Sequence, residues 1–293
     1  MQVTEIDVHD GAQVKAWWEI ARDADADGRD YPVYWSLRSA TVSFGADNNS
    51  VEQHPLAVVE DDQVVGVNQV MFPLLDNRHL AYVEPLVAAK HRRRGIGTAL
   101  LEASLDMVRQ AGRAVVVSET HMPLAADQES SGSAFLCRHG FEKAIVDVHR
   151  VLDLPVAAAR LDELRDASVP HHRDYRLVRW EDDVPVEYVA GYCDLQTAFN
   201  AEAPMGDLEI EAEVWDEERV RKREKRFRDQ GRRETVTAAI AADDTMVGIT
   251  EMMTTDEQRQ MAWQGGTLVL RGHRGHRLGI ALKAVNLERS GID

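Results

Sequence analysis

The chain has 293 residues with 50 acidic and 34 basic side chains, and its formal net charge at pH 7 is −16. This negative charge opposes nucleic-acid or anionic-membrane binding as the main task, and it favours cationic substrates such as amines. No apolar run approaches the roughly 18 residues of a membrane span, and two cysteines suit a reducing cytoplasm. The length predicts two domains.

The first half of the chain predicts strands and helices around one sheet. Residues 3–8 alternate as a strand does, and residues 12–24 have apolar side chains at helical spacing. The further elements expected are a helix at 34–44, strands at 56–59, 64–72 and 79–88, a helix from 96 to about 111, a strand at 114–118, a helix at 131–139 and closing strands within 141–154.

A basic, glycine-containing loop joins the expected strand 79–88 to the helix that follows it. The loop reads Arg92-Arg93-Arg94-Gly95-Ile96-Gly97-Thr98. Such a loop directs backbone N–H groups and a helix N-terminus at one point, which suits a pyrophosphate. The two glycines leave no side chain in the way of a ligand, and the arginines add positive charge. The sequence therefore predicts a phosphate-binding loop here.

The spacing of Arg92, Gly95 and Gly97 resembles the Arg/Gln-x-x-Gly-x-Gly/Ala signature of the GCN5-related N-acetyltransferase (GNAT) superfamily. The resemblance implies a mixed α+β fold, with a mostly antiparallel sheet flanked by helices. It also implies transfer of an acetyl group from acetyl-CoA to a primary amine, by direct attack in a ternary complex and without a metal. Residues 92–98 would hold the pyrophosphate, and the backbone of Leu86, Val87 and Ala88 would hold the pantetheine arm.

The same pattern returns about 180 residues later, which indicates two domains. Arg274 falls on Arg92 and Gly279 on Gly97, whereas Arg277 replaces Gly95 and is expected to obstruct the phosphates. The chain resembles the tandem actinobacterial type of the superfamily. This resemblance implies that the two halves form a pseudo-dimer within one chain, and that the whole protein is a monomer or a homodimer. The expected divisions are a GNAT domain at 1–154, a linker at 155–173, and a degenerate GNAT-like domain at 174–293.

The second half predicts its own set of elements. These are strands at 175–178, 235–241, 247–253 and 264–270, with helices at 185–200, 217–228 and 280–290. The highly charged segment 217–233 is expected to be a solvated helical face. The superfamily fold requires another strand, a helix and a hairpin after residue 290, so we expect the second domain to be truncated.

Glu84 is the candidate general base, because it lies on the strand near the opening where the superfamily often carries an acidic catalytic residue. A surface or ion-paired glutamate is the alternative interpretation. Glu119 is a second candidate, and Gly266 occupies the place of Glu84 in the second copy. Leu136 stands where the superfamily often has a proton-donating tyrosine, and the adjacent Cys137 is expected to be a buried thiol.

The predicted activity is therefore acetyl transfer to a small-molecule amine, since a fused second domain tends to wall off the acceptor site. Two alternatives stay open. One is a non-catalytic acyl-CoA-binding or interaction module, favoured by the leucine at position 136 and the altered second loop. The other is a protein lysine acetyltransferase, with which the acidic charge is compatible.

Overall fold

The computed structural model describes residues 1–46, 50–124, 130–202 and 205–288. The chain divides into two compact units, Met1–Arg150 with Gly206–Leu208 (unit 1), and Val151–Met205 with Glu209–Asp293 (unit 2). Each unit is built around its own antiparallel-rich sheet flanked by helices. This arrangement confirms the predicted mixed α+β fold class with two similar halves.

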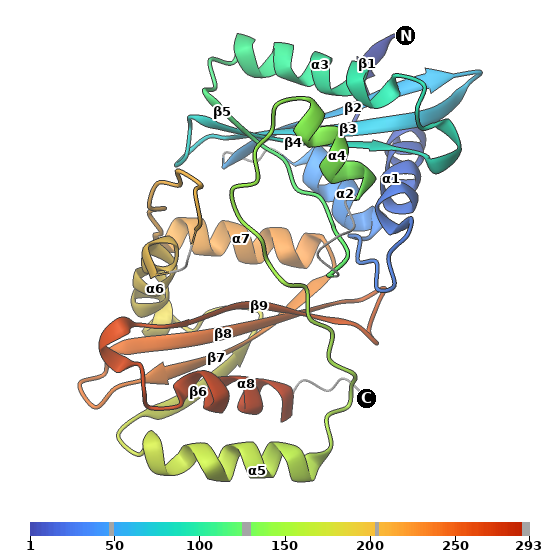
Figure 1. Cartoon of the computed structure of the whole chain (residues 1–293). Coiled ribbons are helices and arrows are strands. Elements are labelled where there is room, and N and C mark those ends of the chain that lie inside the picture. Colours follow the sequence, from blue (N-terminus) through green and yellow to red (C-terminus); the bar gives the residue numbers. More distant parts are fainter. Residues whose placement is uncertain (47–49, 125–129, 203–204, 289–293) are drawn as a thin grey trace. The chain divides into compact units, whose positions relative to one another are not determined.

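Five strands form the sheet of unit 1, in the order β1-β2-β3-β4-β5 (Figure 1). Their bounds are β1 Val3–Glu5, β2 Val51–Glu60, β3 Gln63–Pro73, β4 Leu80–Val87 and β5 Val115–Val117. The first four strands pair antiparallel, and β5 joins β4 in parallel. That parallel pairing ends at Tyr82 and Val117, so residues 83–87 have a neighbouring strand only on the β3 side among the described residues. The sheet is thus open beside the end of β4.

Helices cover both faces of this sheet (Figure 1). On one face α3, Ile96–Gln110, buries Ile96, Leu100 and Val108 against the strands. On the other face lie α1, Gly11–Ala26, and α2, Leu37–Gly45, with Trp17 of α1 in the core. The Asp10 carboxylate caps α1 by accepting from the amide of Ala12 at 2.9 Å. Helix α4, Ser131–Arg138, follows β5 in the chain.

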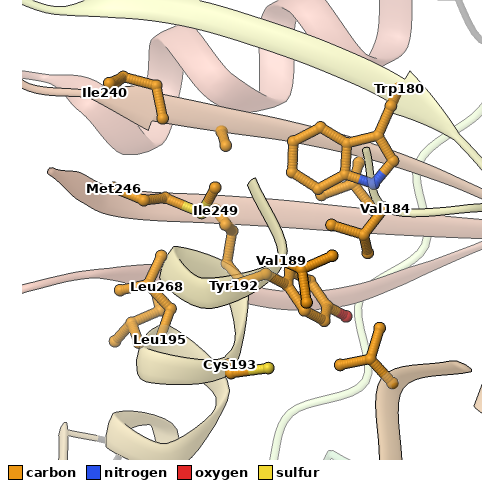
Figure 2. Close-up of a cluster of buried hydrophobic side chains, with 13 residues drawn as sticks. Trp180, Val184, Val189, Tyr192, Cys193, Leu195, Ile240, Met246, Ile249 and Leu268 are labelled. Carbon is orange, nitrogen blue, oxygen red and sulfur yellow. The ribbon is translucent and has the colours of Figure 1, made fainter. Parts of the chain in front are cut away.

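Unit 2 repeats this plan with four antiparallel strands in the order β6-β7-β8-β9. Their bounds are β6 Arg176–Glu181, β7 Arg232–Ile240, β8 Met246–Thr255 and β9 Ala262–Val269. The helices are α5 Ala158–Ser168 and α8 Leu278–Glu288 on one face, with α6 Val189–Glu202 and α7 Glu217–Asp229 on the other (Figure 1). Trp180, Tyr192 and Ile249 meet in the core between α6 and the strands (Figure 2).

The predicted closing strands within 141–154 are wrong for the described part of the chain, because that segment has no regular secondary structure and belongs to neither sheet. A strand needs a partner for its backbone groups, and apolar alternation alone does not provide one. Phe141 packs on the core of unit 1, whereas Val146, Val148 and Leu152 are exposed.

The structure also bears on three smaller expectations. The segment 155–173, predicted as a linker with some helical character, contains helix α5, whose Leu161 is buried within unit 2. Cys137 is exposed rather than buried, since it lies on the outer side of α4, while Leu136 faces the core. The helix predicted at 280–290 is α8 as far as Glu288, and positions 289 and 290 lie outside the described residues.

The segment 217–233 forms the expected helix α7, but the prediction of a solvated face is wrong for one side. Val220 and Glu224 are buried. Arg223 forms a two-pronged ion pair with buried Glu234, with both N–O distances at 2.6 Å. A helix with this much charge stays against the sheet because its inward-facing charges are paired.

Candidate active site

The loop between β4 and α3 in unit 1 has an unusual backbone. After a short 3-10 turn at Ala89–His91, Arg93 has φ of +62° and Gly95 has φ of +85°. Left-handed values are natural for glycine and strained for arginine. No side chain caps the start of α3. Its first N–H groups are therefore available to donate hydrogen bonds to an anion, which fits the predicted phosphate-binding role.

The two glycines of the loop have different surroundings. A Cβ added to Gly95 meets no atom within 4 Å, so this glycine is needed for its conformation and for access from outside. A Cβ added to Gly97 would lie 3.4 Å from the Phe135 ring and 3.7 Å from a methyl group of Val87. These are ordinary van der Waals distances, so the packing of α3 on α4 and β4 leaves room for a Cβ at position 97.

Of the three loop arginines, two are engaged within the protein. Arg92 donates to the carbonyl of Val87 at 3.1 Å and pairs with Asp27 at 2.6 Å. Arg94 pairs with Glu60 at 2.9 Å. Arg93 is exposed and has no ion pair among the described residues. Arg93 is therefore the loop cation left to meet a phosphate, and Arg92 ties the loop to β4 and to the end of α1.

The backbone groups predicted to hold a pantetheine arm lie at the open end of β4. Leu86 stands opposite Val67 in the register with β3. The Val87 carbonyl accepts from Arg92, and the Ala88 amide donates to the Val65 carbonyl at 3.1 Å. A ligand arm along this edge would rely on the remaining groups of residues 83–87. Further along the loop, Ile96 is buried under the sheet, and the Thr98 hydroxyl lies 3.3 Å from Nε2 of His139.

Glu84 lies on the β4 side that faces α1, because alternate residues of β4 point to opposite faces and Val83 joins the α3 core. Its amide donates to the Asn68 side-chain carbonyl at 2.8 Å, and the Asn68 amide group donates to Ser104 at 2.6 Å. Both Asn68 and Ser104 are buried, so this relay holds the strand in place at Glu84.

The pKa of Glu84 is raised to about 7, chiefly by burial and also by the nearby charges of Asp25 and Glu119, against the effect of Arg29. Glu119 is exposed just after β5, and its charge acts on Glu84, so the two predicted catalytic candidates are neighbours. A carboxyl group that titrates near neutral pH is suited to accept a proton from an ammonium group.

Sequence reasoning missed the rest of this cluster. Asp25 pairs with Arg29 at 2.5 Å, and Nε2 of His121 lies 3.7 Å from an Asp25 oxygen. Burial raises the pKa of Asp25 and lowers that of His121. Burial also raises the pKa of Tyr34, with Glu84 and Asp25 adding to the effect. The spacing of four between Asp25 and Arg29 at a helix end is the one signal that was readable beforehand.

The corresponding loop of unit 2 has the same backbone shape. Gly275 has φ of +89° and Arg277 has φ of +53°, which match Arg93 and Gly95 in order. Arg274 donates to the Val269 carbonyl at 3.0 Å and pairs with Glu202 at 2.6 Å, as Arg92 does with its own partners. The Arg277 guanidinium donates to the Ala167 carbonyl at 3.2 Å. Replacing the glycine has thus left the loop backbone unchanged.

The carboxylate of unit 2 sits on a different strand. Gly266 takes the place of Glu84, and Glu251 of β8 lies opposite the irregular stretch of β9 that contains this glycine. Glu251 accepts hydrogen bonds from the Tyr192 hydroxyl and the Gln196 side chain, both at 2.7 Å. Figure 2 shows Tyr192 on α6 beside the strands. Alignment of the two halves places Gly266 at the position of Glu84, so Glu251, which lies on another strand, could not be identified from the sequence.

Within the described residues, no helix has the length and apolar character needed to cross a bilayer, and no three metal-binding side chains converge.

Residues 15–128 match the model of the acetyltransferase (GNAT) family. The chain is similar to a tandem GNAT protein from the clavulanic acid biosynthesis pathway, with 27% identity over 98% of this chain and 84% of that one, at a TM-score of 0.74. It also has the fold of a GCN5-related N-acetyltransferase from Sphaerobacter thermophilus, with 16% identity over 99% of this chain and 84% of that one, at a TM-score of 0.61. A search among curated proteins gave no match.

Proposed function

We propose, on the premise that the chain belongs to the GNAT superfamily and is of its tandem type, that unit 1 transfers an acetyl group from acetyl-CoA to a primary amine of a small molecule. Acetyl-CoA would supply the activated acyl group, and the chain would supply binding, orientation and a proton acceptor. The site residues are Glu84 and the loop from Arg92 to Thr98. Glu119 is a second acidic candidate.

The loop supports the binding part of this proposal. A pyrophosphate would meet the uncapped N–H groups at the start of α3 and the exposed Arg93 guanidinium. Gly95 would let it approach the backbone without steric obstruction. The pantetheine arm would then run along residues 83–87, where β4 has no neighbour on the β5 side among the described residues. That path ends beside Glu84.

The observation that carries the catalytic part is the pKa of about 7 for Glu84 next to this open edge. An amine attacks a thioester only in its neutral form, so the ammonium proton must leave first. Glu84 in its ionised form would accept that proton, directly or through one water. The acidic neighbours Asp25 and Glu119 favour a cationic acceptor at the same place.

The test is turnover by the full chain with acetyl-CoA and a panel of amines, measured as release of free thiol. The panel would contain diamines, amino sugars and amino acids, with a lysine-containing peptide as the protein-like acceptor. Amine-dependent thiol release by wild type and its loss in Glu84→Gln would support the proposal. Gly95→Glu serves as the control in which the loop is expected not to bind acetyl-CoA.

Other outcomes would select other functions. Acetylation of the peptide but of no small amine would identify a protein lysine acetyltransferase. Binding of acetyl-CoA without turnover of any acceptor would identify a non-catalytic acyl-CoA-binding module, and Glu84 would then have no catalytic role.

A further inference from the structure

One side of α7 in unit 2 carries Arg219, Arg223 and Arg226, which are spaced by four and three residues. Side chains at these spacings lie next to one another on a helix, and like charges there destabilise it. The segment 217–234 has nine basic and five acidic residues, a local charge of +4 in a chain whose net charge is −16. These positive charges need carboxylates or other anions close by to balance them.

Most of these cations have a carboxylate of their own. Arg219 pairs with Glu213 at 2.7 Å, and Arg223 pairs with Glu234 at 2.6 Å. Five further ion pairs join cations of this segment to nearby carboxylates: Arg221–Glu224, Lys222–Glu218, Lys225–Asp229, Arg228–Asp183 and Arg233–Asp182.

Arg226 is the exception on this face of α7. It is half-buried and has neither a hydrogen bond from its guanidinium nor an ion pair among the described residues. Burial lowers its pKa, and the charges of Arg223 and Arg219 lower it further. A guanidinium that is partly removed from water and set beside other cations lacks the anion that such a group normally has.

Phe227 follows Arg226 in the chain, and its ring lies beside the guanidinium groups of Arg223 and Arg232. The Cζ atom of Arg223 lies 4.4 Å from the centroid of the Phe227 ring, and that of Arg232, at the start of β7, lies 5.5 Å from it. Burial lowers the pKa of Arg232 to about 10, with Arg226 and Arg223 as the further causes. The Glu234 ion pair holds Arg223 in place in advance of any ligand.

We propose that Arg226, with Arg223 and Arg232 around the Phe227 ring, forms a binding site for a small oxyanion, a phosphate or carboxylate group. Planar guanidinium groups bind such groups through paired hydrogen bonds, and a bound anion would reverse the repulsion among the arginines. This site belongs to unit 2 and is independent of the acyl-transfer chemistry proposed for unit 1.

The experiment measures the thermal stability of the full chain in inorganic phosphate, in citrate and in sodium chloride of equal ionic strength. We expect phosphate or citrate to raise the Tm of wild type by about 3 °C over the chloride control. Arg226→Met should lose that rise. Without an added oxyanion, the same variant should melt at a temperature equal to or above that of wild type, because repulsion is relieved.

Two control variants keep the result specific. Arg228→Met removes the same charge from the same helix, at a position paired with Asp183, and should keep the phosphate response. Gly95→Glu should also keep it, which excludes the loop of unit 1 as the source. If Arg226→Met keeps the response, or if wild type shows none beyond chloride, the proposal is wrong. A citrate response without a phosphate response would identify a carboxylate ligand.

Discussion

Unit 1 and unit 2 use the same backbone for the strand, loop and helix that the superfamily motif describes. In both loops the second and fourth positions after the strand-end turn are left-handed, with arginine then glycine in unit 1 and glycine then arginine in unit 2. The first arginine of each loop makes equivalent hydrogen bonds. The units differ in the strand that carries an acidic side chain near this motif, which is Glu84 on β4 in unit 1 and Glu251 on β8 in unit 2. The backbone shape is therefore shared while the acidic side chain lies at a different place.

The largest expected effect comes from Gly95→Glu, which should abolish acetyl-CoA binding to unit 1. Its φ of +85° is strained for any side chain, and the carboxylate would repel phosphate at the mouth of the loop. Calorimetric titration is the measurement, read for affinity and stoichiometry. Arg277→Glu is the matched change in unit 2 and should leave one full-affinity site. Two sites in wild type, one of them lost in Arg277→Glu, would show that unit 2 binds as well.

Glu84→Gln should lower kcat by about 100-fold or more, since it removes the proton acceptor. Acetyl-CoA affinity should change by less than about twofold, because Glu84 does not contact the loop. Steady-state kinetics and calorimetry are the two measurements. Glu119→Gln is the control and should have a much smaller effect, as that side chain is exposed. If the two variants behaved in the opposite way, Glu119 would be the base.

The pKa of Glu84 also predicts two opposite dependences on pH. Activity should rise with pH and level off above about 7, as the base ionises. Stability should fall as pH rises from 4.5 to about 7, because the folded state keeps a proton that the unfolded state has released. At pH 8 we expect Glu84→Gln to be more stable than wild type by about 3 kcal/mol, because a pKa raised from 4.5 to about 7 corresponds to about 1.4 kcal/mol per unit. Denaturant unfolding of both proteins at pH 4 and pH 8 measures this. If the difference in free energy of unfolding between Glu84→Gln and wild type were the same at both pH values, the raised pKa would be contradicted.

The smallest expected effects are those of alanine substitutions at Arg92 and Arg93, which should differ in kind. Arg92→Ala should lower the free energy of unfolding by about 1–2 kcal/mol, because it leaves the Val87 carbonyl and Asp27 without their partner. Arg93→Ala should leave stability unchanged and weaken acetyl-CoA binding by about tenfold, as expected for a loss of one phosphate contact. Arg274→Ala tests the equivalent structural role in unit 2. Equal affinity losses for Arg92→Ala and Arg93→Ala, without a loss of stability, would assign both arginines to the ligand.

The sequence alone was sufficient to predict the features that depend on residues adjacent in the chain. The strand before Arg92, the glycine-containing loop and the helix after it are local patterns, and the repeat at Arg274 follows the same pattern. The mixed fold class, the two halves and the superfamily were therefore readable. The place of Glu84 on β4 was also readable, because it is fixed by the distance from the loop along the chain, and its catalytic role stays a prediction.

Only the tertiary structure decided which side chains share an environment. Asp25 and Arg29 at the end of α1 and Glu119 after β5 come near Glu84, and their effect on its pKa depends on burial, which no single segment encodes. Likewise Glu251 became visible only through the register of β8 and β9. The charged helix α7 and the unpaired segment 141–154 show the same limit, since partners distant in the chain decide whether a charge is buried or a strand forms.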